Sequence, residues 1–352
     1  AYHRMIAYYE TLEPLATDDD GVWKLPDGDA YYAYCLRSAT TTDLTPAQVH
    51  DTGLSEVARI EQEMRQIFAR LGYPDVPNPA RQLLALGQEQ RFLYPNTDEG
   101  RQAALARYQQ ILDEMNAALD PWFSRRPRAK LKVERVPEFR EKTAPGAYYF
   151  PGDLSGSRPG VFYANLRDMN EVHQFGMKTL AYHEGIPGHH YQLSIAQELK
   201  GIPFFRRMVP FTAYAEGWAL YVEQVARQMG MYKDDPWSEL GCLDAELFRA
   251  VRLVVDTGIH YKRWTRQQAI DWMEEHSAQA HESVVSEIER YIVMPWQACA
   301  YKVGMLKMLE LRRKAEAALG EKFDIRRFHD TILDNGAMPL RLLEQLLDRS
   351  LA

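Results

Sequence analysis

The sequence predicts a mainly α-helical fold with a small β-sheet next to a helix that carries a metal site. Three observations lead to this class. Apolar residues recur at steps of three and four over long stretches, which is the period of amphipathic helices. Short runs between residues 130 and 166 alternate instead, as strands do. Directly afterwards, residues 181–192 read AYHEGIPGHHYQ, a cluster of histidines with one glutamate.

The first part of the chain is expected to be helical scaffold. A helix is predicted over residues 2–15, followed by a turn-rich loop over 17–31, whose acidic run lacks the glycine and glutamate spacing of an EF-hand. A capping box at residues 45–48, with proline at the first helical position, begins an amphipathic helix that ends at Gly72. Another amphipathic helix is expected over 105–119.

After Pro121 the period changes to that of strands. Residues 130–136 alternate and stop before a proline, and residues 146–150 and 160–166 form two further strand-like runs, joined by a loop over 151–159. These three runs predict a small sheet placed just before the histidine cluster.

The histidine cluster is typical of a zinc site. Residues 177–182 are expected to form a helix that enters a group made of His183, Glu184, His189 and His190. A His-Glu pair on a helix, with a second histidine on the same side, is how zinc hydrolases place two imidazoles and a base around one metal ion. The other reading is a Gly-Pro helix break with structural histidines.

The spacing of this motif differs from the usual H-E-x-x-H. Pro187 stands four residues after His183 and cannot bind metal, so the second ligand must be His189 or His190. In a straight helix His189 would point away from His183. A two-residue bulge over residues 185–188 would return His189 to the same face, and we therefore prefer His189.

A third protein ligand is expected from the following helix. Glu216 lies on a mostly apolar helix next to a glycine, and a carboxylate is unusual there unless it is paired or bound to metal. Three protein ligands with an open fourth position are typical of catalytic zinc. The other reading of Glu216 is a buried partner of an arginine.

These motifs resemble the bacterial family known as domain of unknown function 885. The hallmark of that family is H-E-x-x-P-G-H followed by an E-G-W-A segment, which stand here as HEGIPGH (183–189) and EGWA (216–219). The resemblance continues through residues 247–260 and 290–304, so it covers most of the chain.

The resemblance implies a mainly helical, gluzincin-like metallopeptidase fold, similar to the oligopeptidase and carboxypeptidase families with helical clefts. It implies that His183, His189 and Glu216 bind Zn²⁺ and that Glu184 is the general base. In gluzincin-like peptidases an edge strand binds the substrate backbone. The predicted sheet could do this or be a structural hairpin, and the sequence favours neither.

The resemblance also bears on domain organisation. We expect a single catalytic domain over residues 1–352, with helical scaffold in 1–125 and the sheet and metal-site helices in 126–352. Because many family members are longer and carry an export or lipoprotein signal, this is expected to be the C-terminal part of a longer bacterial chain, exported or bound to the cell envelope.

The helix predicted over residues 240–261 carries a polar stripe at steps of three or four. Its members are Arg249, Arg252, Asp256 and His260. Such a stripe is either an exposed face of ion pairs or one wall of a wet cleft. In the cleft interpretation His260 would stabilise the tetrahedral intermediate, while Asp256 or Arg252 would hold neighbouring groups.

Further candidates for oxyanion stabilisation lie near a helix start at Pro295. Tyr301 follows Gln297 by four residues, which places both on one helix face. We take Tyr301 as the first candidate and Tyr291 as the second, together with Arg290. Each tyrosine could equally be a buried structural residue.

Composition excludes some classes of protein. The net charge is −7 with acids and bases interspersed, so nothing indicates a nucleic-acid surface. No apolar run approaches the roughly 20 residues that a membrane-spanning helix needs. The three cysteines are far apart in the chain and form neither a disulfide framework nor a metal cluster. Composition and cysteine content by themselves leave the oligomeric state and the compartment open.

The expected function is zinc-dependent hydrolysis of peptide bonds in small peptides. Zinc would acidify a water molecule, and Glu184 would take its proton and pass it to the leaving amine. Tyr301, His260 or Arg290 would stabilise the oxyanion. The alternatives are a non-catalytic zinc-binding or peptide-binding protein and a zinc-dependent amidase acting on a non-peptide substrate.

Overall fold

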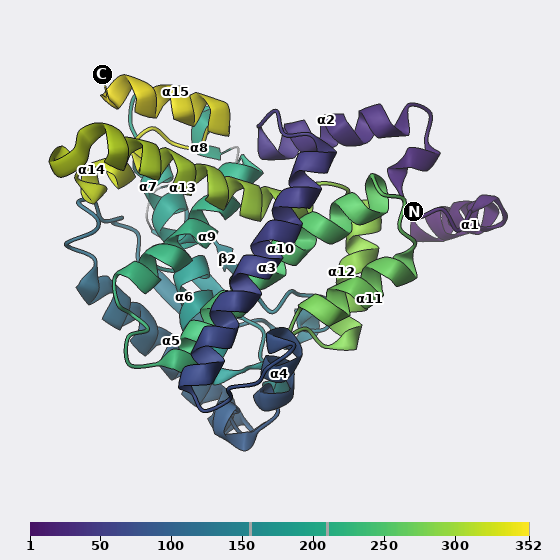
Figure 1. Ribbon diagram of the computed structural model, residues 1–352, viewed down its shortest axis with the longest axis horizontal. Coiled ribbons are helices and arrows are strands. Elements are labelled where there is room, and N and C mark those ends of the chain that lie inside the picture. The colour runs from purple at the N-terminus through teal and green to yellow at the C-terminus, as the bar shows by residue number, and fades with distance from the viewer. Residues whose placement is uncertain (155–156, 209–210, 352) are drawn as a thin grey trace.

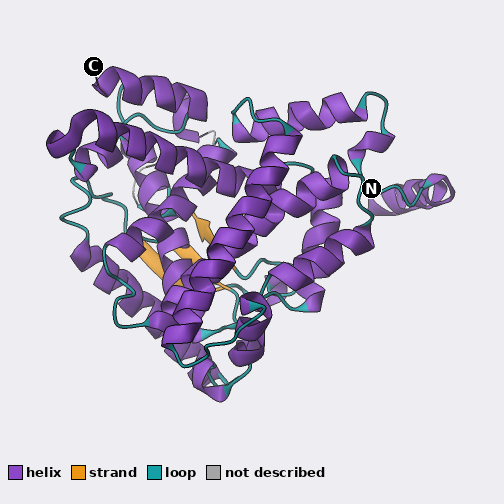
Figure 2. Ribbon diagram, in the orientation of Figure 1, coloured by secondary structure: helices purple, strands orange, loops and turns teal. Residues whose placement is uncertain are grey.

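The fold is mainly helical with one small three-stranded sheet, as the sequence predicts (Figures 1 and 2). It is known from a computed structural model that describes residues 1–154, 157–208 and 211–351. The elements up to the sheet are α1 (Tyr2–Leu12), α2 (Gly28–Thr40), α3 (Pro46–Arg70), α4 (Pro79–Gly87), α5 (Asp98–Ala118), β1 (Leu131–Arg135), β2 (Ala147–Phe150) and β3 (Gly160–Ala164). The helices after the sheet are α6 (Met177–Glu184), α7 (His189–Glu198), α8 (Phe204–Met208), α9 (Thr212–Gln228), α10 (Pro236–His260), α11 (Arg266–His276), α12 (His281–Val293), α13 (Ala300–Leu319), α14 (Ile325–Leu333) and α15 (Leu340–Leu351).

Local signals place α1, α3 and α5 correctly, whereas α2 and α4 were not predicted. The predicted capping box starts α3, where the Thr45 hydroxyl accepts a hydrogen bond from the backbone of Gln48 and the Gln48 side chain accepts one from the backbone of Thr45. The loop predicted over residues 17–31 is wrong in its second half, because α2 begins at Gly28. The turn-forming residues there mask a helix whose apolar side is buried by tertiary contacts, with Tyr32 1% exposed.

The three predicted strands form one mixed sheet in the order β1-β3-β2. β3 is central, parallel to β1 and antiparallel to β2, and Phe162 of β3 pairs with Val133 on one side and Tyr149 on the other. The ring of Phe162 packs edge-on against Tyr108 of α5 at 5.0 Å between centroids. β2 is left at an edge of the sheet, next to α6 and α7. Of the predicted loop 151–159, residues 155–156 lie outside the described part.

Two large hydrophobic cores organise the described helices, and a smaller third cluster packs α2 against α3, α10 and α13. One lies between α5, the sheet, α6, α7, α9 and α13 to α15, so it joins residues from both sides of position 125. The other lies between α3, α4, α10, α11 and α12. α3 and α10 lie side by side along their lengths through the middle of the molecule, while α1 projects from one end with no buried residue (Figure 1).

α9 and α13 cross with their backbones in contact at two glycines. A Cβ atom added to Gly304 would lie 2.0 Å from the carbonyl oxygen of Ala213 and 2.7 Å from the Cα atom of Gly217. Only glycine fits such an approach, because any side chain would push the helices apart. The crossing therefore brings together the residues that flank the glycines, Glu216 on α9 and Tyr301 on α13.

Replacing Gly304 by alanine is expected to destabilise the protein by about 1–3 kcal/mol, because the added methyl group overpacks this crossing. Urea unfolding of the variant checks the result. Gly146→Ala is the control, since a Cβ atom at Gly146 would meet nothing within 4 Å. Equal stability of the Gly304→Ala variant and the wild type would contradict the described crossing.

No helix in the described ranges is long and apolar enough to cross a bilayer. The cysteines Cys35, Cys242 and Cys299 are free and buried, in agreement with the expectation that they form no disulfide framework.

Candidate metal centre

The histidine motif folds as two helices joined by a tight turn. The predicted bulge within one continuous helix is wrong, because α6 ends at Glu184 and α7 begins at His189. Pro187 cannot continue a helix, and Gly188 lies so close to α6 that an added Cβ atom would be 1.9 Å from the carbonyl oxygen of His183. The indole nitrogen of Trp218 on α9 donates to the carbonyl of Pro187 at 2.9 Å, which holds the turn against α9.

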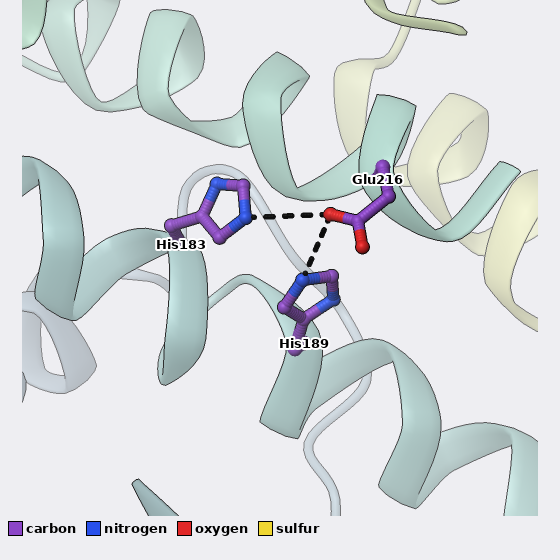
Figure 3. A group of neighbouring side chains, drawn as sticks. All are labelled: His183, His189 and Glu216. Atoms are coloured by element: carbon purple, nitrogen blue, oxygen red, sulfur yellow. Dashed lines mark ion pairs between the residues drawn. The ribbon is translucent and has the colours of Figure 1, made fainter. Parts of the chain in front are cut away.

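The turn brings His183 and His189 together with Glu216. His183 lies at the end of α6, His189 at the start of α7 and Glu216 in α9, and Figure 3 shows the three side chains pointing toward one another. The Oε2 atom of Glu216 lies 3.5 Å from Nε2 of His183 and 3.2 Å from Nε2 of His189. The two imidazole rings are perpendicular, with centroids 4.8 Å apart.

This group fits a zinc ion in its donor types and spacing. With zinc–ligand distances of about 2.0–2.2 Å, a tetrahedral site separates its ligand atoms by roughly 3.3–3.6 Å. The Oε2 atom of Glu216 is buried and accepts no hydrogen bond of ordinary geometry, although it faces both imidazoles. Within the described residues no other group of three His, Cys, Asp or Glu side chains is gathered in this way.

A second layer of buried side chains orients His183. Its Nδ1 atom lies 2.7 Å from the Oε1 atom of Glu223, and the hydroxyl of Thr179 donates to the other carboxylate oxygen of Glu223. Donation from Nδ1 to Glu223 leaves the Nε2 lone pair facing Glu216, as a metal ligand requires. Sequence reasoning missed Glu223. Its spacing of seven residues from Glu216, two turns along the same helix face, was an available signal.

Charge accumulates in this buried group. Burial lowers the pKa of His183, but hydrogen bonds to Glu216 and Glu223 outweigh it and raise this pKa to about 9. Burial also opposes the charge of Glu216, yet the two histidines hold the pKa of its carboxyl well below the usual range. Without a metal ion the protonated imidazole of His183 offsets these carboxylates, and a bound dication would take the place of its Nε2 proton.

Replacing Glu223 by glutamine is expected to weaken zinc binding about tenfold or more, because the neutral amide no longer orients and polarises His183. Competition with a chromophoric chelator measures this affinity. Glu282→Gln, on an exposed part of α12, serves as the control. An affinity equal to that of the wild type would show that Glu223 does not support the site.

Glu184 has the environment expected of a general base. It follows His183 in the last turn of α6 and is 8% exposed. Its carboxylate makes no hydrogen bond or ion pair within the described residues, whereas Glu223 is fully engaged. A carboxylate next to the histidine–glutamate group and free of other partners can accept a proton.

His190, the alternative ligand, faces away from the group. Its Nδ1 atom lies 3.0 Å from the hydroxyl of Tyr149 on β2 and 3.4 Å from the hydroxyl of Ser194. Burial lowers the pKa of His190 to about 4, so this imidazole is neutral near pH 7. Its contacts tie α7 to the edge strand.

Among the candidates for oxyanion stabilisation, the structure places Tyr301 beside the group. Burial raises the pKa of Tyr301, and the negative charge of nearby Glu216 raises it further. The amide of Gln297 donates weakly to its hydroxyl, at 3.5 Å. Tyr301 is therefore a neutral phenol held close to the histidine–glutamate group.

His260 and Tyr291 are engaged elsewhere, which argues against the role expected for them. The backbone of Val22 donates to Nδ1 of His260 at 3.1 Å, so its Nε2 atom carries the proton and donates to the carbonyl of Tyr291 at 3.0 Å. The Tyr291 hydroxyl donates to Glu287. No hydrogen bond, ion pair or ring contact within the described residues joins either side chain to the group in Figure 3.

Asp256 and Arg290 are also bound to neighbours. Asp256 is fully buried and accepts hydrogen bonds from the hydroxyl of Tyr32 and the backbone of Trp296, which makes it a structural anchor. Arg290 donates to the side chain of Gln297 at 2.7 Å, so it reaches Tyr301 only through Gln297.

Two open surface hollows of about 520 and 450 Å³ lie along α3, and neither is lined by His183, His189 or Glu216. The candidate centre is thus defined by its donor atoms and their packing. The side chains of Glu216 and His189 are partly exposed, at 20% and 13%, whereas that of His183 is 4% exposed.

Comparison with known proteins identifies a family and similar structures. A family model described as "Bacterial protein of unknown function (DUF885)" matches residues 1–347. A crystal structure of a protein from Colwellia psychrerythraea, provisionally described as a lipoprotein, is 45% identical with a TM-score of 0.95, covering 97% of this chain and 58% of that one. The structure of a Shewanella oneidensis protein, provisionally described as a lipoprotein of unknown function, is 20% identical with a TM-score of 0.80. The match covers 98% of this chain and 63% of that one. The chain thus spans about three fifths of each protein. No curated protein matches.

Proposed function

We propose that this chain, which belongs to the DUF885 family of bacterial proteins, is a zinc-dependent metallopeptidase that hydrolyses small peptides. One observation carries the proposal. Two histidines and a glutamate from three helices place their donor atoms within 4.8 Å of one another, and a glutamate with no hydrogen bond or ion pair among the described residues directly follows the first histidine. A site that only binds zinc does not need the additional carboxylate of Glu184, which is not one of the proposed ligands.

In this proposal His183, His189 and Glu216 hold the zinc ion, and Glu223 orients His183 from behind. Bound zinc supplies a Lewis acid that polarises the scissile carbonyl and makes water more acidic. Glu184 takes a proton from the attacking water as its oxygen bonds to the carbonyl carbon. It then gives that proton to the amine nitrogen as the C–N bond breaks.

Tyr301 is the proposed donor to the oxyanion. Its hydroxyl is neutral and lies close to Glu216, so it could donate a hydrogen bond to an oxygen that gains negative charge during attack. Arg290 supports Tyr301 through Gln297.

A gluzincin-like cleft with substrate bound along β2 is part of the same proposal. β2 pairs only with β3, which leaves its other backbone edge able to accept a peptide as an additional strand. The contact between Tyr149 of β2 and His190 fixes this edge next to α7, whose first residue is His189.

A cell-envelope location is also proposed, since the 45% identical protein from Colwellia psychrerythraea is provisionally described as a lipoprotein. Fractionation of cells that express the full-length protein, followed by immunoblotting, checks this location.

Digestion of a peptide library tests the function. The purified chain is incubated with zinc and an equimolar hexapeptide library, and the products are followed by mass spectrometry. Cleavage that a chelator stops and added zinc restores would support the peptidase. Peptide binding without cleavage would indicate a binding protein, and hydrolysis limited to non-peptide amides would indicate an amidase.

A further inference from the structure

Three arginines from two helices gather beside Tyr301. Arg249 and Arg252 lie one turn apart on α10, and Arg290 lies on α12. The guanidinium carbon of Arg252 is 4.9 Å from the ring centroid of Tyr301 and 4.1 Å from that of Phe248. Arg252 therefore packs on the residue that stands next to Glu216, and the charge of Arg249 also acts on that residue.

Too few acids neutralise these arginines. Arg252 and Arg290 share one carboxylate, that of Glu287, at 3.0 and 2.8 Å. Arg249 forms no ion pair within the described residues and instead donates to the backbone of its own helix. Asp244 interacts electrostatically with Arg249, so two carboxylates, those of Glu287 and Asp244, face three guanidinium groups. The group keeps an excess of positive charge.

Two of these guanidinium groups have buried donors without a partner. Arg252 is only 7% exposed, yet its Nε–H has no hydrogen-bond acceptor among the described residues, and the same holds for the Nε–H of Arg249. A buried N–H without an acceptor is costly, so such donors in a native protein call for an explanation. An anionic group of a ligand would supply the acceptors.

The position of the arginines relative to the candidate metal centre follows from the helix crossing. Tyr301 precedes Gly304 by one turn, and Gly304 contacts Gly217, the neighbour of Glu216. The guanidinium group of Arg252 packs on the ring of Tyr301, and the charge of Glu216 acts on the same tyrosine. A ligand oxygen bound by the arginines would thus lie beside the group that includes Glu216.

We propose that Arg249, Arg252 and Arg290 form a carboxylate-binding subsite beside the metal centre. Guanidinium groups present paired N–H donors that match the two oxygens of a carboxylate. This inference rests on the proposed peptidase and specifies its substrates as peptides with a carboxylate close to the scissile bond. That carboxylate is either the free C-terminus or an acidic side chain.

Substrate pairs test the subsite. A hexapeptide library is prepared as free acids and as C-terminal amides, and kcat/KM is measured for each form. A second pair consists of amidated peptides that carry glutamate or glutamine at the same position. In one of these pairs the member without the carboxylate lacks a charge-assisted contact. Its kcat/KM is expected to be about tenfold to a hundredfold lower than that of the other member. A difference in the first pair identifies the C-terminal carboxylate as the group that the arginines bind. A difference in the second pair identifies an acidic side chain as that group.

Arginine variants tie that preference to the subsite. Arg249→Gln is suited to this because Arg249 is only partly buried and has no ion pair to lose. We expect this variant to reduce the preference for the carboxylate form about tenfold and Arg249→Lys to retain part of it. Arg81→Gln, an exposed and unpaired arginine on α4, should keep the wild-type preference.

A binding measurement separates this inference from the proposed activity. Calorimetry with the Glu184→Gln protein in the presence of a chelator compares the acid and amide libraries without turnover. If the free acids bind selectively and Arg249→Gln abolishes this selectivity, the result supports the subsite even when no peptide is cleaved. Equal binding and equal cleavage of both members of each pair by the folded wild type would overturn it.

Discussion

The purified chain is expected to contain about one zinc ion, and both His183→Ala and Glu216→Ala are expected to lose it. The Nε2 atom of His183 and the Oε2 atom of Glu216 lie 3.5 Å apart, and in the proposed site each residue would supply one of three protein ligands. Removing one ligand of three leaves two, which is too few for a catalytic zinc site to persist through purification. Elemental analysis of the wild type and both variants measures the metal content.

The histidines at positions 189 and 190 provide a matched comparison. His189→Ala should lose zinc, whereas His190→Ala should keep it, because His190 faces Tyr149 on β2. Thermal unfolding gives a second readout, since a ligand that binds only the folded state raises the melting temperature. A chelator should therefore lower the melting temperature of the wild type and His190→Ala, but not that of His189→Ala. Loss of zinc from His190→Ala alone would contradict the described register, and a wild type free of zinc after reconstitution would remove the metallopeptidase proposal.

Glu184→Gln is expected to retain zinc and to lose peptidase activity by at least about a hundredfold. The variant keeps the size of the side chain but removes the carboxylate that accepts the proton from water, and general-base catalysis contributes roughly 10²–10⁴-fold. The measurements are zinc content together with kcat/KM on the peptides that the wild type cleaves.

The control for this variant is Glu282→Gln, which neutralises an exposed glutamate on α12 and should retain full activity. Wild-type activity of Glu184→Gln would exclude Glu184 as the base. Loss of both zinc and activity would assign it to the metal site instead.

Local sequence signals such as caps and periodicity were sufficient to predict most helices and strands. They were insufficient where a segment with turn-forming residues becomes helical because its apolar side is buried. The capping box at Thr45 sets the start of α3 because its hydrogen bonds involve only neighbouring residues. α2 was missed because its first residues favour turns, and its stability comes from burying Tyr32 against distant parts of the chain. The histidine motif was located correctly, but Gly188 and Pro187 form a turn between two helices rather than a bulge within one.

The polar stripe on α10 shows why spacing alone could not assign roles. Arg252 and His260 lie on one helix with the same periodic signal, yet they have different partners. His260 is locked between the backbones of Val22 and Tyr291, whereas Arg252 lies against Tyr301. Which partners a periodic residue meets is decided by the helices that pack on it, and these come from distant parts of the chain.

The sequence by itself determined the helical class, the three strands and the residues that could hold a metal ion, because periodicity, caps and ligand chemistry are local properties. Only the tertiary structure decided that His183, His189 and Glu216 converge, that Glu223 stands behind His183 and that Tyr301 lies beside Glu216. The physical reason is the contact between Gly217 and Gly304, together with the bond from Trp218 to Pro187. These contacts join segments that only the folded chain brings together.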